Sequence, residues 1–175
     1  MSPDLRYPIG PFRHDAPSDA AARAALIDRI ATQPARLEAA TSGLSRSQLD
    51  TPYRDGGWTV RQLVHHLADS HLNAYCRCRL ALTEERPVIK PYDQDGWARG
   101  ADYEMEIGVS LALLARLHER WVALLRALDD AALGRTFFHP EDRVEVSLER
   151  AIATYAWHGD HHIGHVNALR ERRGW

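Results

Sequence analysis

Hydrophobic residues recur at helical spacing in four long segments, and this periodicity constrains the fold of the chain more than any other feature of its sequence. The segments cover residues 18–41, 59–83, 109–128 and 148–172. Apolar residues three and four positions apart line one face of an α-helix. Helices of this kind bury their apolar faces against one another, so the pattern predicts an all-α four-helix bundle.

The ends of these helices carry their own signals. Thr59 is followed by Gln62, which is the spacing of a capping box ahead of an apolar run. Ser147 can cap the last helix. Pro34 falls inside the first helix, where its missing N–H should kink or split the helix.

The connections between the helices are also readable. The string SRSQLD at 45–50 predicts a short helical turn before the second helix. A long crossover loop of about twenty residues follows that helix, and such a loop in a compact domain is more often functional than idle. Alternating apolar residues at 136–148 flank a turn at Pro140, which predicts a small β-hairpin before the last helix. Residues 1–17 hold several prolines and are expected to form an irregular arm.

The bulk composition bears on the class of protein. A length of 175 residues suits a single domain over the whole chain, residues 1–175. The formal net charge of −2 gives no electrostatic reason to expect binding to nucleic acid or an anionic membrane. No signal peptide and no membrane-spanning apolar run are recognisable, so we expect a cytoplasmic protein. Cys76 and Cys78 lie two apart on a helix and cannot pair there, which fits a reducing compartment.

Ten histidines are present, and most of them fall into two clusters. In the last helix, His158/His162 and His161/His165 both have the i, i+4 spacing that places two imidazoles on one face. Stepping about 100° per residue puts His158 and His162 on the flank of the apolar face. The other pair lies further toward solvent. A metal site on this helix is therefore predicted at His158 and His162.

The second helix offers three more candidates. His65 lies nearly opposite the apolar face and is expected at the surface, whereas His66 and His71 lie on or beside that face. A metal inside a bundle must be reached from such positions, so His66 and His71 both stay open as a third ligand. Three neutral imidazoles suit zinc, nickel or iron and leave positions open for water or substrate. The isolated histidines at 14, 118 and 139 are interpreted as structural.

Several strings in the sequence resemble the DinB superfamily of metal-binding four-helix bundles, and more closely its YfiT-like metal-dependent hydrolases, which are related to the bacillithiol S-transferases. These strings are RYPIG at 6–10, LDTPYRDGGWTVRQLVHHLADSHLNAY at 49–75, PYDQDGW at 91–97, LHERW at 117–121, TFFHPE at 136–141 and YAWHGDHHIGHV at 155–166. The resemblance extends over essentially the whole chain.

The resemblance implies a metal site and an assembly. The metal ligands of the family fall on His66, His158 and His162, with His71 near the metal but not bound to it. One divalent metal per subunit is implied, with zinc as the first expectation and nickel or another transition metal as the alternative. A homodimer is implied as well.

The activity implied by the resemblance is metal-dependent hydrolysis, in which the metal activates water for attack on a small-molecule substrate. One alternative is a bacillithiol-type S-transferase that uses the metal to activate a low-molecular-weight thiol. Another is a non-catalytic module that binds a metal or a ligand. No catalytic residue is assigned; Tyr53, Arg54, Tyr92 and Trp97 lie in loops that could contact substrate.

Overall fold

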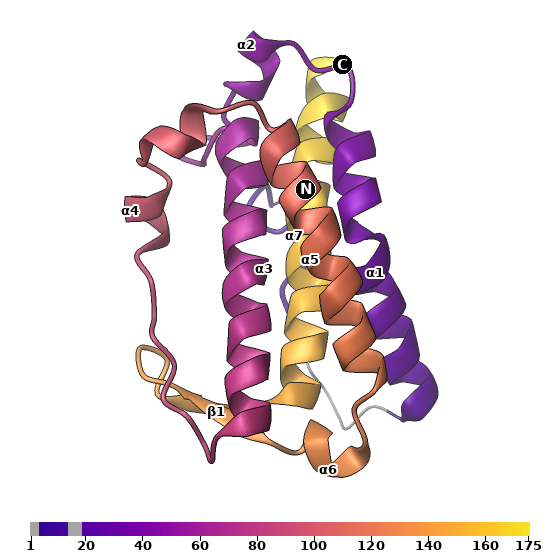
Figure 1. Cartoon of the computed structure of the whole chain (residues 1–175). Coiled ribbons are helices and arrows are strands. Elements are labelled where there is room, and N and C mark those ends of the chain that lie inside the picture. Colours follow the sequence, from indigo (N-terminus) through magenta and orange to yellow (C-terminus); the bar gives the residue numbers. More distant parts are fainter. Residues whose placement is uncertain (1–3, 14–18) are drawn as a thin grey trace.

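Four long helices lie side by side and form the body of the molecule (Figure 1). The computed structural model describes residues 4–13 and 19–175. The long helices are α1 (Ala20–Thr41), α3 (Val60–Thr83), α5 (Gly108–Arg126) and α7 (Leu148–Arg173). Both α1 and α3 pack against α5 and α7, so α1 and α3 occupy diagonal corners of the bundle. The predicted four-helix bundle is confirmed.

The helix ends follow the predicted capping chemistry. The Thr59 side chain accepts a hydrogen bond from the Gln62 amide, and the Gln62 side chain accepts one from the Thr59 amide. Ser147 accepts from the Arg150 amide at the start of α7. Of the kink or split predicted at Pro34, the split is wrong, because α1 continues through this residue. Pro34 is buried, and packing against two neighbouring helices offsets the lost backbone hydrogen bond.

Short elements fill the connections. They are α2 (Arg46–Leu49), α4 (Gln94–Trp97), η1 (Ala101–Glu104), α6 (Asp130–Leu133) and the strands β1 (Thr136–His139) and β2 (Val144–Ser147). The strands pair antiparallel, with Thr136 opposite Ser147, so the predicted hairpin is confirmed. The long loop passes beside α3 and carries α4 and η1 (Figure 1). Of the predicted N-terminal arm, residues 1–3 and 14–17 lie outside the described residues, as does His14.

The core consists of two apolar clusters, one near the hairpin and one near α2. The first includes Ile30, Trp121 and Leu148, and the second includes Leu37 and Leu63. On each long helix a polar side chain lies between the residues that belong to the two clusters. These four side chains, Gln33, His71, His118 and His158, are called the polar layer below.

Close packing of α1 on α7 depends on one glycine that faces Gln33 of the polar layer. A Cβ atom at Gly159 would lie 2.3 Å from the Gln33 side chain. Without it, Gln33 reaches the neighbouring helix and donates to the Ala156 carbonyl at 2.9 Å. The buried amide nitrogen of Gln33 thereby has a hydrogen-bond partner.

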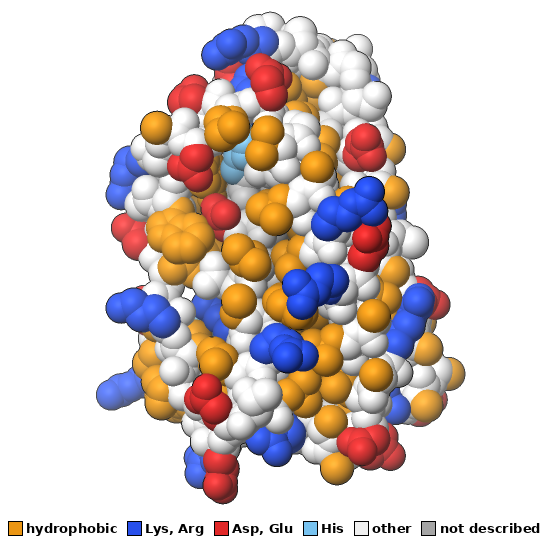
Figure 2. All heavy atoms as spheres, viewed as in Figure 1, with side chains coloured by type: hydrophobic (Ala, Val, Ile, Leu, Met, Phe, Trp, Pro, Cys, Tyr) orange, Lys and Arg blue, Asp and Glu red, His pale blue; other side chains and the backbone are white. Residues whose placement is uncertain are grey.

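None of the described helices has the length and apolarity needed to span a lipid bilayer. On the face shown in Figure 2, basic and acidic side chains are interspersed with apolar ones rather than gathered into a patch of one sign. This agrees with the near-neutral charge of the sequence.

Candidate metal centre

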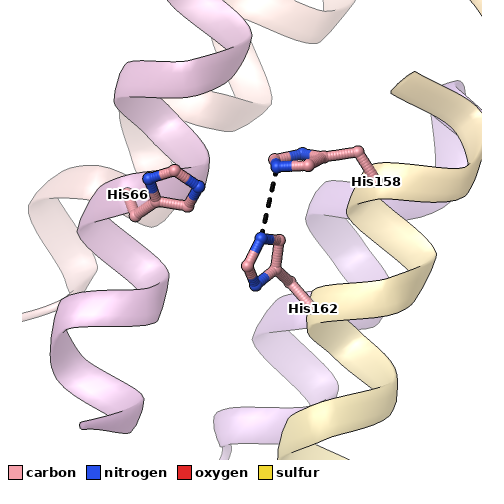
Figure 3. A group of neighbouring side chains, drawn as sticks. All are labelled: His66, His158 and His162. Atoms are coloured by element: carbon pink, nitrogen blue, oxygen red, sulfur yellow. Dashed lines mark hydrogen bonds between the residues drawn. The ribbon is translucent and has the colours of Figure 1, made fainter. Parts of the chain in front are cut away.

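Three imidazoles from two helices converge around His158 of the polar layer. His66 projects from α3 toward His158 and His162 of α7 (Figure 3). One ring nitrogen from each of the three lies within 4.8 Å of the others. The sequence-predicted set of three is thus brought together in the fold.

The two histidines of α7 are placed by helix geometry alone. Residues four apart lie one above the other on a helix, and the Nε2 atoms of His158 and His162 are 3.2 Å apart. The third ring depends on packing between helices. The ring centre of His66 is 5.5 Å from that of His158 and 5.0 Å from that of His162.

Burial keeps these rings neutral. It lowers the pKa of His66 to about 4, and it holds the pKa of His158 and of His162 well below the ordinary value. The mutual repulsion of the neighbouring imidazoles lowers the last two further. Neutral imidazole is the form that binds a metal, so no proton needs to be removed from a cationic ring near pH 7.

The donor set fits a divalent transition metal. Three neutral imidazoles converge, and two of their buried ring nitrogens, Nδ1 of His66 and Nδ1 of His162, have no hydrogen-bond partner in the described part of the chain. Within residues 4–13 and 19–175, no cysteine or carboxylate joins the group. Three protein ligands with an open position are the arrangement typical of catalytic rather than structural zinc.

His71, the alternative third ligand on α3, lies outside the group of three. His71 is fully buried in the polar layer, and its Nε2 lies 3.3 Å from Nδ1 of His158. It therefore contacts a member of the triad from behind, as the resemblance implied. His71 in turn lies 2.8 Å from His118 of α5.

His118 was not recognised from the sequence as part of the site. It was interpreted as structural because it stands alone in α5. Its position between Leu114 and Trp121, on the buried stripe of that helix, was the available signal. Only the packing of α5 against α3 shows that it contacts His71.

Two expectations about exposure were wrong. His65 is buried, because the long loop and the start of α5 cover it: its ring nitrogens contact Ser110 Oγ at 2.7 Å and the Met105 carbonyl at 3.2 Å. His165 is also buried, and the tilted Tyr53 ring packs against it with the ring centres 4.2 Å apart. Helical phase could not predict either result, because it does not show which other elements cover a face: the long loop and α5 cover His65, and Tyr53 covers His165.

His161 is half-buried rather than open to solvent. The N-terminal arm lies along α7, where Tyr7 faces the His161 ring at 6.1 Å, and Trp157 stacks on the same ring at 4.5 Å. Its Nε2 atom lies 3.1 Å from Nε2 of His165. These two rings form a second pair beside the triad.

Two cavities have His158 in their walls. The first, of about 430 Å³, is lined by all three imidazoles together with Tyr53, Arg54, Trp58 and Asp95. The second, of about 620 Å³, is lined by Ser70, Arg77, Tyr92, Tyr155 and residues of the hairpin turn. His158 and Gln94 line both.

The loop residues proposed from sequence divide between these cavities. Tyr53 and Arg54 line the first cavity and Tyr92 lines the second, whereas Trp97 is 42% exposed, packs on Tyr92 and lines neither. Sequence reasoning missed Asp95, although it lies within the PYDQDGW string. The Asp95 carboxylate accepts a hydrogen bond from Trp58 Nε1 at 3.1 Å.

The family model of the DinB superfamily matches residues 29–166, and this helical bundle with three converging histidines belongs to that family. A relative from Oceanobacillus iheyensis is 48% identical over 170 residues, covering 97% of this chain and 98% of the relative. YfiT of Bacillus subtilis is 47% identical over 175 residues, covering 99% and 98%. The names of both relatives propose a metal-dependent hydrolase.

A solved structure of Bacillus subtilis YfiT agrees with this assignment. It matches 98% of both chains with a TM-score of 0.95 and 48% identity. That protein is described as having an unusual four-helix bundle topology. The present chain is therefore a YfiT-like member of the DinB superfamily.

Proposed function

We propose that the protein is a metal-dependent hydrolase of a small molecule, with one divalent metal held by His66, His158 and His162. The observation that carries the proposal is the convergence of three neutral imidazoles on the wall of a cavity. A metal bound there would supply a Lewis acid that lowers the pKa of water. Zinc suits the three-nitrogen donor set, and nickel is the alternative.

Asp95 is proposed as the proton acceptor in this cavity. Its carboxylate is oriented by Trp58, and the Trp58 ring lies 4.5 Å from His66. During hydrolysis of an ester, the water oxygen would bond to the carbonyl carbon while Asp95 takes the water proton. The carbon–oxygen bond to the leaving group would then break, and Asp95 would return the proton to the leaving oxygen.

Replacing Asp95 with asparagine tests this role. Asparagine keeps the oxygen that accepts from Trp58 but cannot take a proton, so kcat is expected to fall about 100-fold with the metal content unchanged. The exposed Asp55 of the neighbouring loop provides a control, because Asp55→Asn removes the same charge outside the first cavity. Equal turnover by D95N and wild type would reject Asp95 as the proton acceptor.

Thiol transfer is the second candidate, favoured by the two cavities that meet at His158. A transferase must bind a thiol and an electrophile together, and the cavities at His158 offer a compartment for each. A non-catalytic binding module is less well supported, because the triad has no fourth donor among the described residues.

Turnover by metal-loaded protein distinguishes these candidates. We expect hydrolysis of p-nitrophenyl acetate that scales with bound metal, needs no thiol and is lost in His158→Ala. A parallel reaction contains monochlorobimane with and without bacillithiol. Conjugation only in the presence of thiol, without ester hydrolysis, would replace the hydrolase with an S-transferase. Neither reaction, with metal fully bound, would indicate a binding role.

The homodimer and the cytoplasmic location stay predictions. Both come from the sequence and its family resemblance. A concentration-independent monomer by light scattering would contradict the first.

A further inference from the structure

An unbroken line of hydrogen-bonding contacts runs through the polar layer and ends at the triad. The Ile30 carbonyl lies 2.8 Å from His118 Nδ1, and His118 Nε2 lies 2.8 Å from His71 Nδ1. His71 Nε2 lies 3.3 Å from His158 Nδ1. The line thus crosses from α1 through α5 and α3 to α7.

The carbonyl at one end determines the direction of every bond in the line. A carbonyl oxygen only accepts, so His118 must donate from Nδ1, and a neutral imidazole has no second N–H. His118 Nε2 therefore accepts from His71 Nδ1, and His71 Nε2 accepts from His158 Nδ1. The remaining nitrogen of His158, Nε2, keeps its lone pair and points toward His162, 3.2 Å away.

The surroundings hold the two inner rings in these orientations. His71 is fully buried and His118 is 2% exposed. The Trp121 ring stands nearly perpendicular to both, 5.7 Å from each ring centre, and Tyr155 stands perpendicular to His71 at 5.5 Å. Burial lowers the pKa of both histidines, which supports their neutral form.

We propose that His71 and His118 are positioning residues, forming with the Ile30 carbonyl an imidazole relay that fixes His158 in the tautomer with Nε2 free for the metal. The inference rests on the proposed metal site. Hydrogen bonds behind a ligating histidine fix its ring orientation and its tautomer, and their loss typically lowers metal affinity about 10- to 100-fold.

The tautomers can be observed directly. In metal-free wild-type protein, the ¹⁵N chemical shifts of the histidine rings are expected to show the Nδ1–H form at His118, His71 and His158. An Nε2–H form at any one of these three would overturn the relay, whether or not the protein binds metal.

Metal affinity provides the second measurement. Zinc affinity by competition with a chelator is expected to fall about 10- to 100-fold in His71→Phe. The zinc affinity of the His118→Phe variant should also fall, but by less, because His118 acts on His158 only through His71. His118→Gln should recover part of the loss, because an amide can donate to Ile30 and accept from His71. His65→Phe is the matched control: it also removes a buried, doubly hydrogen-bonded imidazole of α3, but one outside the relay.

The outcomes separate the two proposals. Wild-type protein that binds no metal overturns the proposed function and the role of the relay with it. Normal affinity in wild type and in both folded phenylalanine variants overturns the relay alone. If the His118→Phe variant does not fold, the ¹⁵N shifts of the wild type and the zinc affinity of His71→Phe still test the relay.

Discussion

His158→Ala is expected to abolish stable metal binding, with the affinity lowered more than about 100-fold. Loss of an outer hydrogen-bond partner alone costs about 10- to 100-fold, and this change removes a proposed ligand itself. His66→Ala and His162→Ala should behave alike, because each leaves only two of the three converging nitrogens. Metal content after desalting, measured by plasma mass spectrometry, and zinc affinity by chelator competition are the readouts.

His65→Ala and His161→Ala are the matched controls. Each removes an imidazole adjacent in sequence to a triad member, yet neither belongs to the converging group. Both variants should keep the metal. Full metal content in the three triad variants, or its loss in both controls, would reject the assignment of the ligands.

Lowering the pH from about 6.5 toward 4 is expected to destabilise the metal-free protein steeply. Burial lowers the pKa of His66 and of His118 to about 4 from an ordinary value of 6.5. Between these pH values the unfolded chain binds protons that the folded chain does not, so the free energy of unfolding falls with falling pH. At pH 4 each of these two rings would lower the free energy of unfolding by about 3 kcal/mol.

The two losses together are comparable with the whole stability of a typical domain, which is about 5–15 kcal/mol. Above about pH 6.5 both histidines are deprotonated in the folded and in the unfolded chain. Their contribution to the free energy of unfolding should therefore not change with pH in that range. Urea denaturation followed by circular dichroism from pH 5 to 8, with a chelator present, measures the dependence. His66→Phe should reduce the slope by up to about 1.4 kcal/mol per pH unit. A free energy of unfolding that does not change from pH 8 to 5 would contradict the expectation.

Most of the helical architecture was predictable because its signals are local. Periodicity located the four long helices within a few residues, and the capping box at Thr59 marked the start of α3 at Val60. The exception at Pro34 is informative. A proline is unfavourable inside an isolated helix, but its burial and the packing of α1 against α5 and α7 outweigh that local penalty.

Part of the candidate metal site was also predictable from local sequence. The i, i+4 spacing of His158 and His162 is a property of one helix, and their phase relative to the apolar face selected them over His161 and His165. The choice of His66 over His71 was different. Helical phase left both open, and the family resemblance favoured His66.

Helix positions and the pairing of His158 with His162 were thus determined by the sequence itself, because spacing along one helix controls them. The tertiary structure alone decided that the long loop buries His65, and that His118 of α5 contacts His71 of α3. Asp95 reaches Trp58 and the cavity of the triad only because that loop folds back beside α3. Contacts between elements depend on packing and on the course of loops, and neither is written in the periodicity of a single helix.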